Sequence, residues 1–362
     1  MDCTVAQKLA SLSDTPGVPK MPRTPLTVLL SWAWIAYVIE VDNAVESAGA
    51  EHVGRLFNIS VPRWANGLRL IPEEGITLGR LQRKAEAHCN IGGLERWGWI
   101  AVGEQNGTHR TGYGTQKGLK ADTVVRPTRA GSYARRLFPQ AVEAVEQRWR
   151  HRLGTTLIDE LRAGLAGPAM PWSPPEVHPS DGFLSHVVDA DDEVVEDGPL
   201  VALLGQTLTA FTVEQEDGAA ISLPLAANFL RVLDAQPLAV KDLPACTGLS
   251  KEAVAMALGF LQRRHLTTTD PGRTVRLNSK GQDLFQTYRK RAWQSEDAGL
   301  RAVLSRLLEQ TEALSAGLTP PEGGWRARPP YLAQTHRLLA NPTGALPWHP
   351  MVLHRGGWPD GS

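Results

Sequence analysis

The chain has 362 residues, and its 38 Lys and Arg are balanced by 38 Asp and Glu, so the formal net charge is zero. This length predicts more than one domain, and the balanced charge alone indicates neither a polyanionic nor a polycationic partner. The three cysteines, Cys3, Cys89 and Cys246, are too scattered for a disulfide framework or a zinc site. They are typical of a reducing compartment, so we expect a cytoplasmic protein with no metal or other cofactor.

Catalytic motifs are also missing from the sequence. We find no HExxH, no GxSxG and no phosphate-binding loop that ends in GKS or GKT. The segment GYGTQKG comes nearest to a dinucleotide-binding fingerprint, but its spacing is wrong and no strand precedes it. We therefore expect a protein that is not an enzyme.

An N-terminal extension of residues 1–25 precedes the first predicted helix, which runs from Leu29 to about Val45. Its apolar stretch TVLLSWAWIAYVIEV is about 15 residues long, shorter than the roughly 20 that a bilayer requires. We therefore expect neither a signal peptide nor a membrane-spanning helix. The aromatic residues Trp32, Trp34 and Tyr37 predict that this helix lies in a core.

The segment after this helix occurs twice in the chain. SVPRWANGLRLI begins at Ser60 and is repeated 162 positions later as SLPLAANFLRVL. The repeat extends upstream at an offset of 174, and downstream at an offset of 150, where VVRPTRAG, ending at Gly131, matches TVRLNSKG, ending at Gly281. Internal duplication of this kind predicts two copies of one structural unit, each about 120 residues long.

The first copy has a shortened helical segment and an enlarged loop. The span from Leu81 to Leu94 is 13 positions, against 18 in the second copy, and it contains two adjacent glycines. The loop from Gly103 to Val124 holds five glycines, and the cations of this region are Arg110, Lys117, Lys120, Arg126 and Arg129. A basic, glycine-rich loop favours contact with phosphates or with the minor groove of a duplex. The alternative is an ordinary surface loop.

Residues 156–197 are predicted to form a linker, because MPWSPPEVHPS is rich in proline and VVDADDEVVEDG is a run of charge. Between Pro171 and Asp217 there are 11 acidic residues and no Lys or Arg, whereas 80–152 and 241–306 have surpluses of eight and six basic residues. Two basic regions around an acidic connector are typical of a nucleic-acid-binding protein. Charge runs of this kind also occur on ordinary solvated surfaces.

The second copy contains the clearest signals of local structure. A short helix over 240–246 is followed by a turn, and Ser250 is a candidate N-cap for a helix from Lys251 to about Arg264. Apolar residues recur at spacings of four and three on the inward face of that helix, namely Val254, Leu258 and Leu261. Asp270, Pro271 and Gly272 then favour a tight turn between two short strands. This order of elements predicts a helix-turn-helix followed by a wing.

A tail of residues 316–362 follows the second copy. It is rich in Pro and Gly, so it does not predict a long helix, and its aromatic residues are Trp325, Tyr331, Trp348 and Trp358. We expect it to wrap over the junction between the copies and to bury its tryptophans there.

The pattern LxxxTGLSxxxVxxxLxxLxxxxL, followed by a hairpin, resembles that of the winged-helix regulators of the MarR family. The resemblance covers about 27–153 and 198–310, and the chain also looks like duplicated MarR-like proteins whose tail is close to HRGGWPDGS. It implies a mainly α protein with small β wings, in which tandem winged helix-turn-helix domains form an intrachain pseudo-dimer. The domains would then be 26–155 and 198–315.

The resemblance implies a transcriptional regulator that binds double-stranded DNA, as a monomer with pseudo-two-fold symmetry or as a homodimer. The corresponding first helix of such proteins borders a pocket for small aromatic effectors, which places a ligand hypothesis at Trp34 and Tyr37. The residues expected to contact DNA are Arg96, Arg110, Lys117, Lys120, Arg126 and Arg129 in the first copy, and Ser250, Lys251, Arg263, Arg273 and Arg276 in the second.

Two other functions stay open at the level of sequence. The outward side of the helix from Lys251 has few donors for reading bases, so the protein could instead be an interaction or ligand-sensing protein that uses winged-helix modules without specific DNA binding. A third reading is a winged-helix DNA-repair enzyme that flips a damaged base, for which the sequence nominates no catalytic carboxylate.

Overall fold

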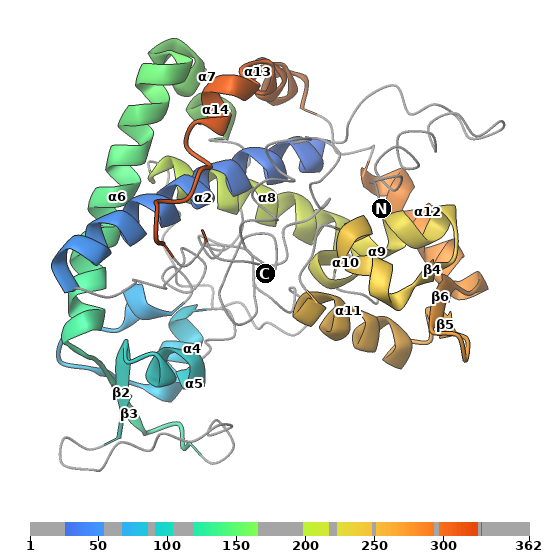
Figure 1. Ribbon diagram of the computed structural model, residues 1–362, viewed down its shortest axis with the longest axis horizontal. Helices are drawn as coiled ribbons and strands as arrows, with labels where there is room; N and C mark the ends of the chain where they lie inside the picture. Colours follow the sequence, from blue (N-terminus) through green and yellow to red (C-terminus); the bar gives the residue numbers. More distant parts are fainter. Residues whose placement is uncertain are drawn as a thin grey trace.

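The computed structural model describes residues 26–53, 67–85, 91–103, 119–165, 198–216, 223–247, 251–292, 297–324 and 327. The described chain is mainly helical, with two small antiparallel sheets of three strands each. Figure 1 shows a group of long helices in the upper part of the molecule and two smaller groups, at lower left and at right, each with one of the sheets. The mainly α fold with small β elements was predicted from the sequence.

Helix α2 (Leu26–Val53) lies at the centre of the long helices because it is apolar on nearly every side. Over Leu26–Gly49 it is long and apolar enough to cross a membrane, but 94% of its apolar 18-residue stretch is buried inside the molecule. It packs against α6 (Arg129–Leu153), α8 (Leu200–Glu216) and α13 (Ala298–Glu309). The segment that we expected in a core is therefore covered by protein.

Helix α7 (Thr155–Leu165) follows α6 directly, and it corrects the linker expected over 156–197. Gly154 makes the sharp connection with a φ of 94°, a conformation that favours glycine. Leu157, Ile158, Leu161 and Leu165 recur at helical spacing and are all buried. That apolar face must be covered, so the chain stays packed through Leu165; residues 166–197 lie outside the described ranges.

Helices α7 and α13 pack antiparallel. Arg306 of α13 pairs with Glu160 of α7, and Leu300 at the start of α13 contacts Gly164 at the end of α7. Glu146 of α6 ties the neighbouring helices together: it accepts hydrogen bonds from Arg162 of α7 at 3.2 Å and from the amide of Leu200 of α8 at 3.3 Å. We call α2, residues 142–153 of α6, α7, α8, α13 and α14 (Thr311–Ser315) the platform.

Two smaller units are joined to the platform. The first unit contains η2 (Leu68–Leu70), β1 (Ile76–Thr77), α4 (Leu78–Ala85), α5 (Ile91–Arg96), β2 (Ile100–Val102), β3 (Val124–Pro127) and the start of α6. The second unit contains α9 (Leu223–Ala235), β4 (Leu238–Ala239), η3 (Val240–Asp242), α10 (Leu243–Thr247), α11 (Lys251–Arg263), β5 (Thr267–Thr269), β6 (Thr274–Leu277) and α12 (Ser279–Ala292). Both sheets place the last strand in the centre, in the orders β1-β3-β2 and β4-β6-β5.

The two halves of the chain, in which we expected domains 26–155 and 198–315, share one hydrophobic core. Helices α8, α13 and α14 come from the second half of the chain, yet their buried residues belong to the same core as α2, α6 and α7. Within the described ranges, α9 to α12 and their sheet form a separate core. The periodicity of α8 and α13 predicts an apolar face for each helix, but not which half of the chain covers it.

Candidate nucleic-acid interface

Helix α11 of the second unit presents one face to its core and the other to solvent. Val254, Leu258 and Leu261 are buried against α9, which confirms the inward face predicted from their spacing. Lys251 and Arg263, at the two ends of the helix, are exposed. The helix thus offers a cation at each end of its outward face.

The corresponding helix of the first unit is described only from Ile91 onward, so its predicted shortness stays a prediction. Helix α5 has six residues against 13 in α11, although residues 86–90 before it lie outside the described ranges. Its Ile91 and Leu94 are buried, whereas Arg96 is exposed with its guanidinium 5.1 Å from the centre of the Trp97 ring. Glu95, next to it, is half-buried.

A threonine fixes the junction between the sheet and the long helix of the first unit. Thr128 is the N-cap of α6: its Oγ1 accepts a hydrogen bond from the amide of Gly131 at 3.2 Å and donates one to the carbonyl of Gly98 at 2.5 Å. Its own amide donates to the carbonyl of Trp99 at 3.0 Å. One residue therefore holds the turn after α5 and the start of α6 together.

An asparagine makes the same set of bonds in the second unit. Asn278 Oδ1 accepts from the amide of Gly281 at 2.9 Å, and Asn278 Nδ2 donates to the carbonyl of His265 at 2.8 Å. The amide of Asn278 donates to the carbonyl of Leu266 at 3.1 Å. The two units thus position the turn, the sheet and the following helix with equivalent bonds from different residue types.

The hairpin of the second unit turns at the residues that its sequence indicated. Asp270 Oδ1 accepts from the amide of Thr274 at 2.8 Å, and the Asp270 amide donates to the Thr274 carbonyl at 3.0 Å. The residue with positive φ is Arg273, at 58°, and not the neighbouring Gly272. A bulky residue in this conformation is strained, and the side chain of Arg273 is exposed beside the turn.

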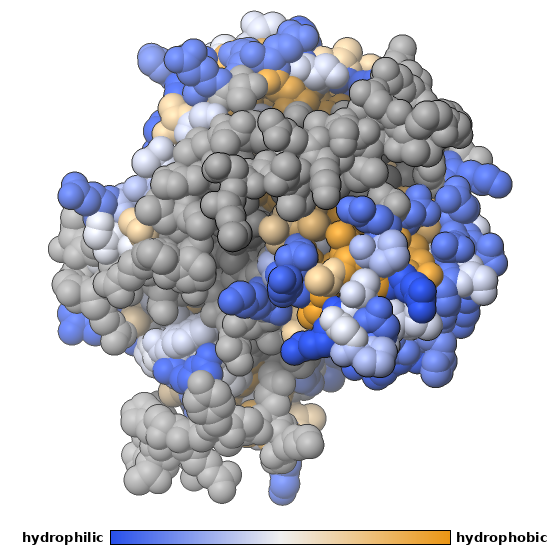
Figure 2. Space-filling model, turned by 45° about the vertical axis from the view of Figure 1, so that its right-hand side comes forward, coloured by the Kyte–Doolittle hydropathy of each residue, from blue (hydrophilic) through white to orange (hydrophobic). Residues whose placement is uncertain are grey.

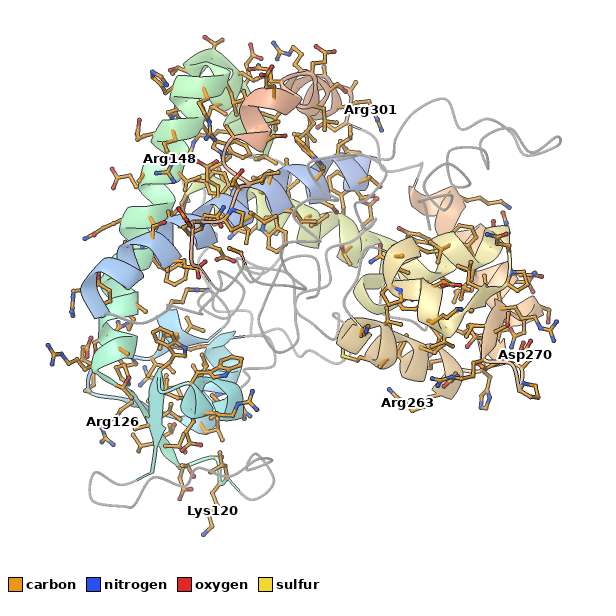
Figure 3. All side chains as sticks on the ribbon, viewed as in Figure 1. Lys120, Arg126, Arg148, Arg263, Asp270 and Arg301 are labelled. Carbon is orange, nitrogen blue, oxygen red and sulfur yellow. The ribbon has the colours of Figure 1, made fainter. Side chains whose placement is uncertain are left out.

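The structure places the described cations of both units at or near the surface. Exposed side chains belong to Arg96, Lys120, Arg129, Lys251, Arg263, Arg273 and Arg276, and Arg126 is half-buried. Arg110, Lys117 and Ser250 lie outside the described residues. In Figure 3, Lys120, Arg126 and Arg263 all lie on the lower part of the molecule, away from Arg148 and Arg301 of the platform.

Two polar contacts beside the second hairpin escaped the sequence analysis. Gln262 of α11 is exposed and its Nε2 donates to Thr269 Oγ1 at 3.0 Å, which places an amide of the kind that reads adenine beside the hairpin. Lys280 Nζ donates to the carbonyl of Arg264 at 3.2 Å. Gln262 follows Ala255 by seven positions and therefore lies on the same face of the helix. This spacing was the signal in the sequence that Gln262 is on the outward face.

Apolar side chains also reach the outward side of α11. Met256 and Phe260 are only partly buried against the second core, and the guanidinium of Arg264 lies 5.7 Å from the centre of the Phe260 ring. Figure 2 shows a hydrophobic patch right of centre on the face it presents, bordered by mostly hydrophilic residues. The face therefore combines cations with apolar contacts and few polar donors.

Trp34 and Tyr37, the residues of the effector hypothesis, are completely buried in the platform. Tyr37 donates a hydrogen bond to the carbonyl of Val142 at 3.0 Å, and its ring meets Trp149 edge to face with 4.9 Å between centres. Burial raises the pKa of Tyr37 well above its ordinary value, and the nearby carboxylates of Glu146 and Glu40 raise it further. Both rings serve as core, and an effector site beside them stays a prediction.

Within the described ranges, no three His, Cys, Asp or Glu side chains come together as a metal site would require. Comparison of the chain with models of known protein families, with curated proteins and with solved structures found no match. The function must therefore be inferred from the two units and the platform themselves.

Proposed function

We propose that the two units are winged helix-turn-helix domains that arose by duplication, and that the platform replaces the interface between two chains of a MarR-like dimer. The support is the equivalence of the two junctions, in which Thr128 and Asn278 make the same bonds to corresponding residues. The platform adds a second argument, because α2 and α7 from one half interleave with α8 and α13 from the other.

The function that follows is binding of double-stranded DNA by a cytoplasmic, non-enzymatic transcriptional regulator. One observation carries it: both units expose cations below the platform, with Lys120 and Arg126 at the lower left of Figure 3 and Arg263 at its lower right. A duplex along this surface would bring its phosphates to both units at once. Two winged domains that use one duplex should bind half-sites about one helical turn apart.

Most of these contacts would be to phosphates. Between its terminal cations, α11 exposes Ala255 and half-exposes Met256 and Gly259, none of which donates hydrogen bonds to base edges. Base recognition by this helix would rest on Gln262 and on apolar contacts, for example with thymine methyl groups. Affinity should therefore depend strongly on salt and less on the exact sequence.

The test is the salt dependence of binding to a labelled duplex, measured by fluorescence anisotropy. Each lost phosphate contact lowers the slope of log affinity against log salt by about 0.9. Replacing Lys120, Arg126 and Arg129 by alanine should lower the slope by about 2 to 3, and so should replacing Lys251, Arg263 and Arg276. Both triple variants should bind more weakly at every salt concentration.

The matched control is Arg306→Ala, which removes an exposed platform cation that pairs with Glu160. It should leave the slope unchanged. If the control lowers affinity as much as the triple variants do, binding is non-specific attraction to a cation anywhere on the surface. If none of the proteins binds the duplex, the proposal fails.

A second candidate, a protein interaction module, is favoured by the partly exposed Met256 and Phe260 on α11. In this case the apolar side chains would supply the affinity and the flanking cations only its orientation. Phe260→Ala would then abolish binding of the partner, whereas on DNA it should have a smaller effect than loss of the three cations.

A further inference from the structure

The two units are fastened to the platform in different ways. The first unit has no core of its own: its buried Leu94, Trp99 and Val125 belong to one continuous cluster with the side chains of α2, α7 and α13. The second unit has a separate cluster, and among the described residues no buried side chain belongs to both. Separate hydrophobic cores are the mark of units that can move independently.

Helix α6 is the physical link that joins the first unit to the platform. It runs without interruption for 25 residues, from the sheet at Arg129 to Leu153. Gly131 and Phe138 are buried at the end near the sheet, and Val145 and Trp149 are buried at the end near α2. A rotation of the first unit would have to bend this helix or unpack its core face.

Helix α12 occupies the same place in the second unit, and residues 293–296 after it lie outside the described ranges. It has 14 residues, and by the offset of 150 between Gly131 and Gly281 its last residue, Ala292, corresponds to Val142. By the same offset, the end of α6 from Val145 to Leu153 corresponds to residues 295–303, of which 298–303 begin α13, a separate helix that packs against α2. The buried Phe285 and Tyr288 of α12 belong to the second unit's own core.

We propose that the second unit moves as a rigid body relative to the platform, whereas the first unit is fixed to it. This asymmetry does not depend on DNA binding. If the proposed function holds, the first unit sets the position of the protein on a duplex. The second unit then adjusts to different spacings between the half-sites.

Hydrogen exchange on two matched variants tests the separation of the cores. Leu94 and Leu261 are both buried and occupy matching places. The Leu94 carbonyl accepts a hydrogen bond from the amide of Trp99, and the Leu261 carbonyl accepts one from the amide of Leu266. Leu261→Ala should reduce protection about tenfold or more in α9, α11 and α12 and leave α2, α7 and α13 unchanged. Leu94→Ala should reduce protection in the platform as well. Loss of platform protection in Leu261→Ala overturns the proposal.

Distances between spin labels test the motion itself. Arg129 and Ser279 are the exposed first residues of α6 and α12, and Ala302 is exposed on α13 of the platform. With the three native cysteines replaced, the pair at 279 and 302 should give a distance distribution about twice as broad as the pair at 129 and 302. Equal widths in the free protein would show that both units are fixed and would overturn the proposal. Because no DNA is present, this outcome is separate from success or failure of DNA binding.

Discussion

Gly131 and Gly281 occupy equivalent positions. Each packs against the backbone carbonyl of the residue that directly precedes a strand, Trp99 before β2 and Leu266 before β5. A Cβ atom on Gly131 would overlap the carbonyl oxygen of Trp99, and one on Gly281 that of Leu266. The neighbour in each case is backbone and cannot turn away. We expect Gly131→Ala and Gly281→Ala each to lower the free energy of unfolding by about 1 to 3 kcal/mol, measured by chemical denaturation.

Helical glycines in open space are the control for this prediction. A Cβ on Gly92 of α5 would meet nothing within 4 Å, and one on Gly259 of α11 only the end of the Arg263 side chain at 3.3 Å. Alanine at either position should raise the free energy of unfolding by up to about 1 kcal/mol because it favours the helix. Destabilisation by all four substitutions alike would show that the overlap at positions 131 and 281 is not the cause.

The turn after α11 gives a second prediction. His265 has a φ of 55°, and Gly98, which accepts the equivalent hydrogen bond in the first unit, has a φ of 75°. A side chain in this conformation is strained, whereas glycine adopts it freely. Glycine relieves this strain but also raises the entropy of the unfolded chain, so we expect His265→Gly to stabilise the protein by a net of up to about 1 kcal/mol. Gly98→Ala should destabilise it. Thermal unfolding of the two variants should move in opposite directions.

Helix α11 and the hairpin of the second unit could be predicted because local signals determine them. Val254, Leu258 and Leu261 show which face of α11 is buried, and Asp270 closes the hairpin through bonds to a residue four positions away. Neither feature requires knowledge of distant parts of the chain. The sequence match between VVRPTRAG and TVRLNSKG also aligned Gly131 with Gly281, and the structure gives both glycines the same surroundings. At each position a backbone carbonyl lies so close that it leaves no room for a side chain.

The helix partners in the platform could not be predicted from local patterns, because they are distant in sequence; only the resemblance to a pseudo-dimer implied that the two halves share an interface. The spacing of Leu157 and Leu161 indicates a helix but not that α13 covers it, and the proline-rich segment that follows suggested a linker instead. Similarly, nothing in the sequence around Glu40 predicts that Arg148 and Arg152 surround its buried carboxylate. Long-range ion pairs of this kind leave no periodic pattern.

Glu40 supplies a third prediction. Its carboxylate, only about 5% exposed, accepts hydrogen bonds from Arg148 Nε and Trp149 Nε1, both at 2.9 Å, and from Arg152 Nη2 at 2.5 Å. Glu40→Ala leaves the buried indole and two guanidinium groups without their acceptor, so we expect a loss of about 3 kcal/mol in the free energy of unfolding. Glu40→Gln keeps an acceptor and should lose less.

The control for Glu40 is an ion pair at the surface. Glu73 is 60% exposed and pairs with Arg135 at 3.3 Å, so Glu73→Ala should cost less than about 1 kcal/mol. Both variants are compared by urea denaturation at neutral pH. Equal effects of the two substitutions would mean that the cluster around Glu40 contributes no more than an exposed pair.

The ionisation of Tyr37 makes the stability of the platform depend on pH. Its pKa in the folded protein is raised well above 10, chiefly by burial, so the unfolded chain loses the phenolic proton first as the pH rises. The contribution of the neutral phenol is present in full below the unfolded pKa near 10, and it is lost as the pH rises from there through the folded pKa.

The fourth prediction follows for Tyr37→Phe. At neutral pH the variant loses the hydrogen bond to the Val142 carbonyl and should be less stable by about 1 to 2 kcal/mol. Above pH 10 the free energy of unfolding of the wild type should fall more steeply than that of the variant, by about 1.4 kcal/mol per pH unit, because the variant has no phenol to ionise at this position. Urea denaturation between pH 8 and about 11 measures both slopes. Parallel curves would show that the phenol ionises equally in both states, which contradicts its burial between α2 and α6.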